Sequence, residues 1–247
     1  MGQPITIVTG GSMGIGLAIV QQQAKSGATV INLDIADFAQ PVAGASWIKC
    51  DVSQVEQVNR AITECLNRFS RIDRLVCNAG MHVSATIEET SEALLDKVFA
   101  LNVKGAYAAI KAVLPQMKQQ KRGAIVVMGS DQTTVGKTNS FVYGMSKAAL
   151  GSIAKTTALD YAEFNVRVNV VCPGTIETPL FHKAIDKYVA ESGANKAEVV
   201  AEETAAQPLG KLGQPQDVAA LTGFLLSDDA GFITGSLHAV DGGYTAK

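Results

Sequence analysis

Short apolar runs alternate with longer segments in which apolar residues recur every three or four positions along most of the chain. The short runs are rich in Val and Ile, which is typical of buried strands, and the longer segments predict helices. The predicted strands lie at 5–9, 29–33, 46–50, 73–77, 123–128, 166–171 and 237–240, and the predicted helices at 14–26, 54–69, 91–120, 140–163 and 215–226. This alternation predicts a doubly wound α/β fold, a seven-stranded parallel sheet with helices on both faces.

The length of 247 residues suits one large core, and no linker, repeat or low-complexity tract divides the chain. We therefore expect a single domain over 1–247. The least regular stretch is about 179–213, between two core elements. Insertions of this kind often cover an active site, and we predict a substrate lid there.

The first predicted strand leads into a glycine-rich turn, Gly10-Gly11-Ser12-Met13-Gly14-Ile15-Gly16, and then into a helix. This order is the start of a dinucleotide-binding βαβ unit of the Rossmann type. Its glycines let the backbone approach a pyrophosphate, and the free N–H groups of the helix start bind it. An ordinary tight strand–helix turn is the alternative.

The second predicted strand ends in Asp34. A carboxylate there accepts hydrogen bonds from the adenine ribose hydroxyls and repels a 2′-phosphate. Neither the glycine-rich turn nor the residues just after Asp34 contain a Lys or Arg that could neutralise that phosphate. The sequence therefore predicts NAD rather than NADP, although Asp34 could instead simply begin a loop.

Tyr143 and Lys147 stand four residues apart in a predicted helix, and Ser130 closes the strand-like run before them. Residues at i and i+4 share a helix face, so the Lys147 ammonium can lower the pKa of the Tyr143 phenol. A positive charge at about 4 Å stabilises the phenolate by about 4 kcal/mol at an effective dielectric near 20. This is enough to lower the pKa of the phenol by roughly 3 units, from about 10 to near 7. The pair thus predicts a general acid/base, unless it is only a solvated helix face.

These motifs, in this order, resemble the short-chain dehydrogenase/reductase family over essentially the whole chain. The resemblance implies a catalytic tetrad of Asn102, Ser130, Tyr143 and Lys147, with Lys147 also on the nicotinamide ribose and Asn102 holding a water of a proton relay. It also implies that the cofactor is bound by Gly10, Ser12, Met13, Gly14, Ile15, Gly16, Asp34, Ile35, Asp51, Val52, Asn78, Ala79, Gly80, Tyr143, Lys147, Pro173, Gly174, Ile176 and Thr178. Asn102 as a helix cap near Val103 and Ser130 as a turn residue remain alternatives.

The resulting prediction is an NAD-dependent oxidoreductase that interconverts a secondary alcohol and a ketone by hydride transfer. Tyr143 removes the alcohol proton and Ser130 holds the reacting oxygen. Asp131, Gln132, His82 and His182 could line the site, which favours a small polar substrate such as a polyol, a sugar derivative or a hydroxy acid. Asp131 could instead be held by backbone groups and point away from the site, and His82 and His182 could also point away.

Two other functions are alternatives. A 3-oxoacyl-[acyl-carrier-protein] reductase usually takes NADPH and docks an acidic carrier on a basic patch, so Asp34 and the net charge of −2 count against it. A non-catalytic NAD-binding sensor would be expected to have lost Ser130, Tyr143 or Lys147, and all three are present.

The composition of the chain limits the classes of partner that it is expected to bind. With charged residues at 18% and a net charge of −2, we expect neither nucleic acid nor an anionic membrane as a partner. The four scattered cysteines, Cys50, Cys65, Cys77 and Cys172, favour buried thiols in a reducing compartment over a disulfide or a metal site. The first strand begins close to Met1 and no uninterrupted apolar stretch is long enough to cross a bilayer, so we expect a cytoplasmic protein. No cluster of histidines and carboxylates suggests a catalytic metal, so we expect none.

The helical segments 103–120 and 140–163 carry many small residues on more than one face, among them Ala106, Ala108, Ala109, Ala148, Ala149, Gly151 and Ala158. Such helices need further burial. Members of the resembled family usually assemble through these two helices, so we expect a homotetramer, with a dimer as the alternative.

Overall fold

The computed structural model describes residues 2–246, and in them the predicted parallel sheet is confirmed. Its seven strands run in the order β3-β2-β1-β4-β5-β6-β7, and every pair is parallel. The strands are β1 Ile5–Thr9, β2 Thr29–Asp34, β3 Ala45–Lys49, β4 Arg74–Cys77, β5 Gly123–Met128, β6 Val166–Pro173 and β7 Leu237–Val240. The order reverses between β1 and β4, the position at which doubly wound sheets form a crevice for a ligand.

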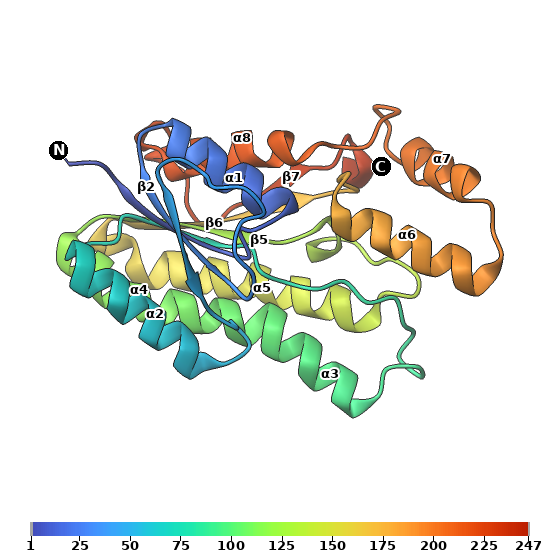
Figure 1. The fold of residues 1–247 in the computed structure, drawn as a ribbon, viewed down its shortest axis with the longest axis horizontal. Helices are drawn as coiled ribbons and strands as arrows, with labels where there is room; N and C mark the ends of the chain where they lie inside the picture. The colour runs from blue at the N-terminus through green and yellow to red at the C-terminus, as the bar shows by residue number, and fades with distance from the viewer. Residues whose placement is uncertain (1, 247) are drawn as a thin grey trace.

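Helices cover both faces of this sheet (Figure 1), with α1 and α8 on one side and α2, α4 and α5 on the other. Their bounds are α1 Gly14–Lys25, α2 Val55–Phe69, α3 Glu92–Val98, α4 Gly105–Gln120, α5 Phe141–Tyr161, α6 Pro179–Ser192, α7 Lys196–Ala206 and α8 Pro215–Leu226. A π-helical turn at Phe99–Lys104 joins α3 to α4, and short 3₁₀ turns lie at Asp131–Thr133, Ala162–Phe164, Asp228–Ala230 and Tyr244–Ala246.

The central strands show why both faces must be covered. Ile7 pairs with Leu75, and Leu75 with Ile125, and this row belongs to the core beneath α2, α4 and α5. The next row, which begins at Val8, belongs to the core beneath α1 and α8. Because successive residues of a strand face opposite sides, an all-apolar strand needs cover on both. Each buried Val, Ile or Leu contributes about 1.5–3 kcal/mol.

The predicted helix at 91–120 is interrupted by the π-helical turn. By length and composition alone, the run Glu92–Gln120 could cross a membrane. Charged residues such as Asp96, Lys97 and Lys104 interrupt it, so it is not the uninterrupted apolar stretch that the sequence was expected to lack. Much of this run is nevertheless built into the molecule, because α4 buries Ala109, Val113 and Met117 against the sheet. A core helix passes the same test of length and composition as a membrane span.

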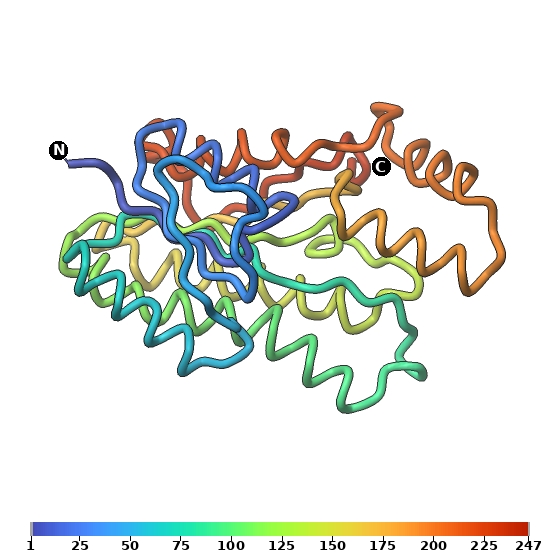
Figure 2. The backbone as a smooth tube through the Cα atoms, in the orientation of Figure 1, coloured from blue at the N-terminus to red at the C-terminus, as the bar shows by residue number. Residues whose placement is uncertain are grey.

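The stretch 179–213 forms two helices, α6 and α7, which stand at one end of the molecule (Figure 2, orange). Helix α6 buries only Ile185, and α7 buries none of its residues. The two helices therefore have much less core packing than the helices that cover the sheet.

Candidate active site

The carboxyl ends of the parallel strands place the predicted site residues along one edge of the sheet. Asn78 directly follows β4, Ser130 is the second residue after β5, and Pro173 ends β6. The neighbouring strands β1 and β2 end at the glycine-rich turn and at Asp34. The fold thus gathers residues that are far apart in the sequence.

The glycine-rich turn is packed too closely for side chains. A Cβ atom on Gly16 would lie 2.0 Å from the carbonyl oxygen of Gly10, and Gly10 itself has a φ of 67°. The turn is also held from below by Asn32, whose Oδ1 accepts from the N–H of Gly11 at 2.7 Å and whose Nδ2 donates to Ser12 Oγ at 2.8 Å. The backbone is therefore fixed in a shape that only glycine allows.

The start of helix α1 suits an anion. Its N-cap residue, Met13, makes no side-chain capping hydrogen bond within the described chain, and its first turn has no acidic residue. The first N–H groups of a helix need acceptors from outside the helix, and its dipole favours negative charge there. Together with the bare glycine turn, this end of α1 fits the pyrophosphate of a dinucleotide.

Asn78, Ala79 and Gly80 lie against the same turn. Thr9 Oγ1 accepts from the N–H groups of Asn78 at 3.0 Å and Ala79 at 3.1 Å, and Asn78 Nδ2 donates to the carbonyl of Gly10 at 2.8 Å. These bonds tie the end of β4 to the end of β1, so that the two segments form one continuous wall.

Asp34 lies beside the turn, as the cofactor prediction requires. Its Oδ2 accepts from the N–H of Ser12 at 3.0 Å, and its carboxylate is half-buried. Met13 and Ile35 flank it with exposed fractions of 57% and 67%. At the end of β3, Asp51 Oδ1 accepts from the N–H and hydroxyl of Ser53, and the next residue, Val52, is buried.

The loop that follows β6 closes over the other side of the turn. A Cβ on Gly14 would lie 3.5 Å from Thr178 Cγ2, and Thr178 Oγ1 caps helix α6 by accepting from the N–H of Phe181 at 3.2 Å. Gly174 fits tightly against Asp241, and Ile176 is buried. The predicted cofactor loop therefore borders the predicted phosphate site.

Tyr143 and Lys147 share one face of α5, with Lys147 Nζ 5.5 Å from the centre of the Tyr143 ring. The prediction that Lys147 lowers the pKa of Tyr143 is wrong for this structure. Burial raises the pKa of Tyr143 to about 12 and lowers that of Lys147 to about 8. The reason is that removal of water disfavours both charges, and the ammonium is directed to the carbonyl of Met128, 2.8 Å away.

Ser130 stands between Tyr143 and Asp131. Its Oγ donates to Asp131 Oδ1 at 2.5 Å, and its side chain also hydrogen-bonds with Tyr143, which lowers the pKa of the phenol. The Asp131 carboxylate acts in the opposite sense and raises the Tyr143 pKa. Asp131 is buried and also accepts from the N–H of Gln132 at 2.8 Å. It is thus held partly by backbone, as one alternative supposed, but it is directed at Ser130.

Asn102 lies inside the π-helical turn, so the alternative that it caps a helix near Val103 is wrong. Its Oδ1 accepts from the N–H of Met81 at 2.9 Å, and its Nδ2 donates to the Met81 carbonyl and to Ser146 Oγ, each at 3.0 Å. A Cβ on Gly80 would lie 3.2 Å from Asn102 Oδ1 and 3.8 Å from Lys147 Nζ. Gly80 thus leaves space between two members of the predicted tetrad.

The four predicted substrate residues separate into two groups. His82 packs edge-on against Tyr143 with ring centres 4.8 Å apart, and burial lowers its pKa. Gln132 is buried next to Gly144, and its Oε1 has no hydrogen-bond partner among residues 2–246. His182, in contrast, is exposed on α6, 3.6 Å from Glu177, and within the described residues it forms no hydrogen bond, ion pair or ring contact with the tetrad.

Two supporting residues were missed from the sequence, Asn32 and Ser146, and a third, Thr9, ends the predicted first strand. Each is a buried polar group that positions a predicted site residue, and Ser146 also donates to the carbonyl of Tyr143 at 2.7 Å. Asn32 offered a signal, because a polar residue inside an otherwise apolar strand must find a buried partner. Ser146 offered none beyond its place between Tyr143 and Lys147.

Comparison with known proteins agrees with this geometry. The chain is 37% identical to the L-fucose dehydrogenase of Mus musculus, over 97% of this chain and 87% of that protein. The ligand-free structure of Thermoplasma acidophilum aldohexose dehydrogenase superposes with a TM-score of 0.93 at 35% identity, covering 100% of this chain and 95% of that one. The NADP-bound structure of ElxO has a TM-score of 0.90 at 30% identity, covering 99% of this chain and 100% of that one.

A family model described as enoyl-(acyl carrier protein) reductase matches residues 10–245, nearly the whole chain. The relatives and solved structures above match over almost their full lengths as well. The chain therefore belongs to the short-chain dehydrogenase/reductase family and is an oxidoreductase that uses a nicotinamide cofactor.

Proposed function

We propose that this oxidoreductase uses NAD to interconvert a secondary alcohol and a ketone on a small polar, hydroxylated metabolite. The observation that carries the cofactor choice is Asp34, whose carboxylate stands beside the glycine-rich turn through its bond to the N–H of Ser12. A negative charge there favours ribose hydroxyls and repels a 2′-phosphate. ElxO, which has this fold, binds NADP, so the fold does not by itself exclude NADP, and our proposal of NAD rests on Asp34.

The glycine-rich turn and the start of α1 would hold the pyrophosphate, Asp34 and Asp51 the adenosine, and Asn78 to Gly80 with the loop 173–178 the nicotinamide half. Met13 and Ile35 offer exposed apolar surface beside Asp34 for the adenine ring. When bound, the nicotinamide supplies the hydride acceptor or donor.

The acid/base work falls to Tyr143. As phenolate it takes the proton of the alcohol, and as phenol it returns that proton to a ketone. Ser130 hydrogen-bonds with Tyr143 and is itself aligned by Asp131, so the reacting oxygen would lie next to both hydroxyls. Lys147, buried beside Asn102 and Gly80, would bind the nicotinamide ribose and pass protons outward.

The polar character of the substrate is inferred from the side chains around Tyr143. Asp131, Gln132 and His82 bring a carboxylate, an unpartnered amide oxygen and an imidazole close to the tetrad. An apolar substrate would leave such groups unpaired, at about 1–3 kcal/mol each. L-fucose dehydrogenase and aldohexose dehydrogenase, which share this fold and about a third of the sequence, are named for sugars.

We further propose that 179–213 acts as a substrate lid. Helix α7 buries none of its residues, and the contacts that tie it to the rest are few, such as Thr175 Oγ1 donating to Glu203 Oε2 at 3.2 Å. Segments with little buried surface open most easily. A lid of this kind would exclude water during hydride transfer.

A homotetramer remains our proposal, with a dimer as the alternative. Most of the small residues that suggested it, including Ala108, Ala109 and Ala158, are already buried within the subunit. The better support is exposed apolar surface, Tyr107 on α4 at 47% and Leu159 on α5 at 80%. Light scattering after size-exclusion chromatography will give the mass of the assembly.

We also propose a cytoplasmic location, which the four buried free thiols support.

The test is NADH formation at 340 nm across a panel of polyols, aldoses, sugar acids, hydroxy acids and apolar secondary alcohols, with NADP in parallel. We expect turnover of a polyhydroxylated substrate with NAD. Asp34→Ser should lower the preference for NAD over NADP by at least tenfold. Asp37→Asn is the matched control, because Asp37 is an exposed acid three residues further along.

Turnover only of apolar alcohols would contradict the polar-substrate proposal, and a wild-type preference for NADP would contradict the role of Asp34. The match to the family model of enoyl-(acyl carrier protein) reductases makes an acyl-carrier-protein substrate the second candidate. The panel therefore includes an enoyl carrier-protein thioester, and for the alternative weighed from the sequence a 3-oxoacyl carrier-protein thioester, each with both reduced cofactors.

A further inference from the structure

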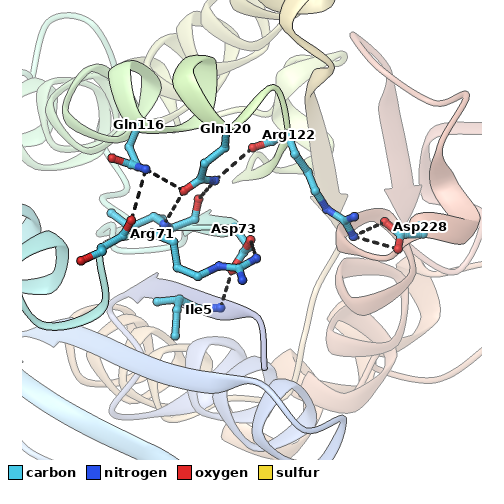
Figure 3. A network of polar contacts seen from close by, with 9 residues as sticks. Ile5, Arg71, Asp73, Gln116, Gln120, Arg122 and Asp228 are labelled. Atoms are coloured by element: carbon cyan, nitrogen blue, oxygen red, sulfur yellow. Dashed lines mark hydrogen bonds and ion pairs between the residues drawn. The ribbon is translucent and has the colours of Figure 1, made fainter. Parts of the chain in front are cut away.

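A cavity of about 340 Å³ lies at the amino ends of the strands, the edge of the sheet opposite to the candidate active site. Its charged lining consists of four arginines and two aspartates: Arg71, Arg74, Arg122, Arg167, Asp73 and Asp228. Figure 3 shows part of this polar network, with Arg71 beside Asp73 and Arg122 beside Asp228.

Both aspartates already form ion pairs with an arginine of the cavity. Arg71 forms a two-pronged ion pair with Asp73, through Nε at 3.0 Å and Nη2 at 2.5 Å. Arg122 Nη2 donates to both oxygens of Asp228, at 2.7 and 2.8 Å. Four guanidinium groups against two carboxylates leave the cavity with two positive charges.

The two remaining arginines have only neutral partners. Arg74 donates to Gln23 Oε1 at 2.9 Å, and Arg167 donates to main-chain carbonyls, including Leu225 at 2.7 Å. Within residues 2–246, neither guanidinium hydrogen-bonds a carboxylate. Burial lowers the pKa of both groups; the charge of Asp228 acts against this and raises both pKa values, and the positive charge of Arg122 lowers them. A half-buried cation that no carboxylate contacts directly is costly, so an anion would stabilise this arrangement.

The strand register explains why the two groups share one cavity. Arg74 of β4 pairs with Ala124 of β5, which pairs with Arg167 of β6. Residues of one row face the same side of a sheet, and alternate strands are roughly 10 Å apart. The small side chain of Ala124 therefore leaves a hollow between two guanidinium groups.

We propose that this cavity binds a doubly charged oxyanion, the phosphate group of a small metabolite, between Arg74 and Arg167. Planar guanidinium groups match phosphate oxygens in pairs, and two of them balance about two negative charges. The cavity is larger than a phosphate group and has the size of a small-molecule site. It is separate from the cofactor phosphates, which we place at the other edge of the sheet.

The experiment titrates the protein with inorganic phosphate by isothermal calorimetry in the presence of saturating nicotinamide cofactor, at constant ionic strength with chloride as the balancing ion. The bound cofactor occupies the glycine-rich turn, so added phosphate reports another site. We expect saturable binding at one site, at least tenfold weaker in Arg74→Gln. Arg60→Gln, which removes the same charge from an exposed position of α2, should bind like wild type.

Arg74→Lys keeps the charge but loses the paired donors, and should bind with intermediate affinity. Absence of saturable binding to the wild-type protein, or equal binding by the wild type and Arg74→Gln, would overturn the proposal. If Arg74→Gln does not fold, the wild-type titration and Arg74→Lys still decide, because equal affinity of those two would also contradict a site built on the guanidinium group. The result does not depend on the proposed substrate or cofactor preference.

Discussion

Replacing Asp131 with Asn should move the pH profile of alcohol oxidation to lower pH. Asp131 and Tyr143 both hydrogen-bond with Ser130, so the carboxylate and the phenol lie about 5 Å apart. Two charges at about 5 Å and an effective dielectric near 20 interact by about 3 kcal/mol, or about two pH units. With partial screening by solvent, we expect a shift of at least about one pH unit.

The sign follows from the role of Tyr143. Burial and the Asp131 charge both raise its pKa, and the phenolate is the form that accepts the alcohol proton. Removal of the Asp131 charge lowers the pKa of Tyr143, so the rise of kcat/KM begins at a lower pH. The other titratable groups near the phenol, Lys147 and His82, are unchanged in this variant.

The measurement is kcat/KM for oxidation from pH 6 to pH 11, because this quantity reports the ionisation of the free enzyme. Asn keeps an oxygen that can accept from Ser130, so the variant changes charge more than geometry. Asp160→Asn, at an exposed position of α5, is the matched control and should leave the profile unchanged. If kcat/KM of the Asp131→Asn variant rises over the same pH range as that of the wild type, the assigned effect of Asp131 on the Tyr143 pKa is refuted.

Three further predictions test other parts of the site. Tyr143→Phe should lose about 10²–10⁴ in kcat while keeping NADH affinity, as measured by fluorescence titration; retained turnover would move the acid/base role elsewhere. Because the folded pKa of Lys147 is lowered to about 8, the unfolded state binds more protons above that pH, and wild-type stability should rise by about 2 kcal/mol from pH 7 to pH 9.5. Urea unfolding of Lys147→Met should show a smaller rise, and an equal rise would contradict the assigned burial. Gly16→Ala should fail to fold or lose several kcal/mol, since its Cβ meets the Gly10 carbonyl, whereas Gly27→Ala, in open space at a φ of 87°, should cost about 1 kcal/mol in the same assay.

The fold could be predicted from the sequence because the patterns that specify its strands, helices and glycine-rich turn are local. A strand buried on both faces must be apolar throughout, a glycine-rich turn must lack side chains, and a covering helix must repeat its apolar residues every three or four positions. These requirements act over a few neighbouring residues, so Ile5–Thr9, Gly10–Gly16 and α1 could be assigned without the rest of the chain. The placement of Asp34 at a strand end was equally local.

The prediction for the pKa of Tyr143 and the alternative of Asn102 as a helix cap were wrong for the same reason. Each depends on side chains that segments distant in the sequence place around the residue. The pKa of Tyr143 depends on burial by the whole site and on Asp131, so the spacing to Lys147 alone gave the wrong sign. The setting of Asn102 depends on a widened helical turn and on its bonds to Met81 and Ser146.

The sequence by itself thus determined the strands, the helices, the cofactor turn and the order of the chemical groups. Only the tertiary structure decided which groups meet, which lose water and which charges stay unmatched. The pairing of Arg74 and Arg167 across Ala124 is the plainest case, because no pattern within β4 or β6 specifies the neighbouring strands. Burial and Coulomb energies depend on distances in space, and the sheet sets those distances only once all of its strands are in register.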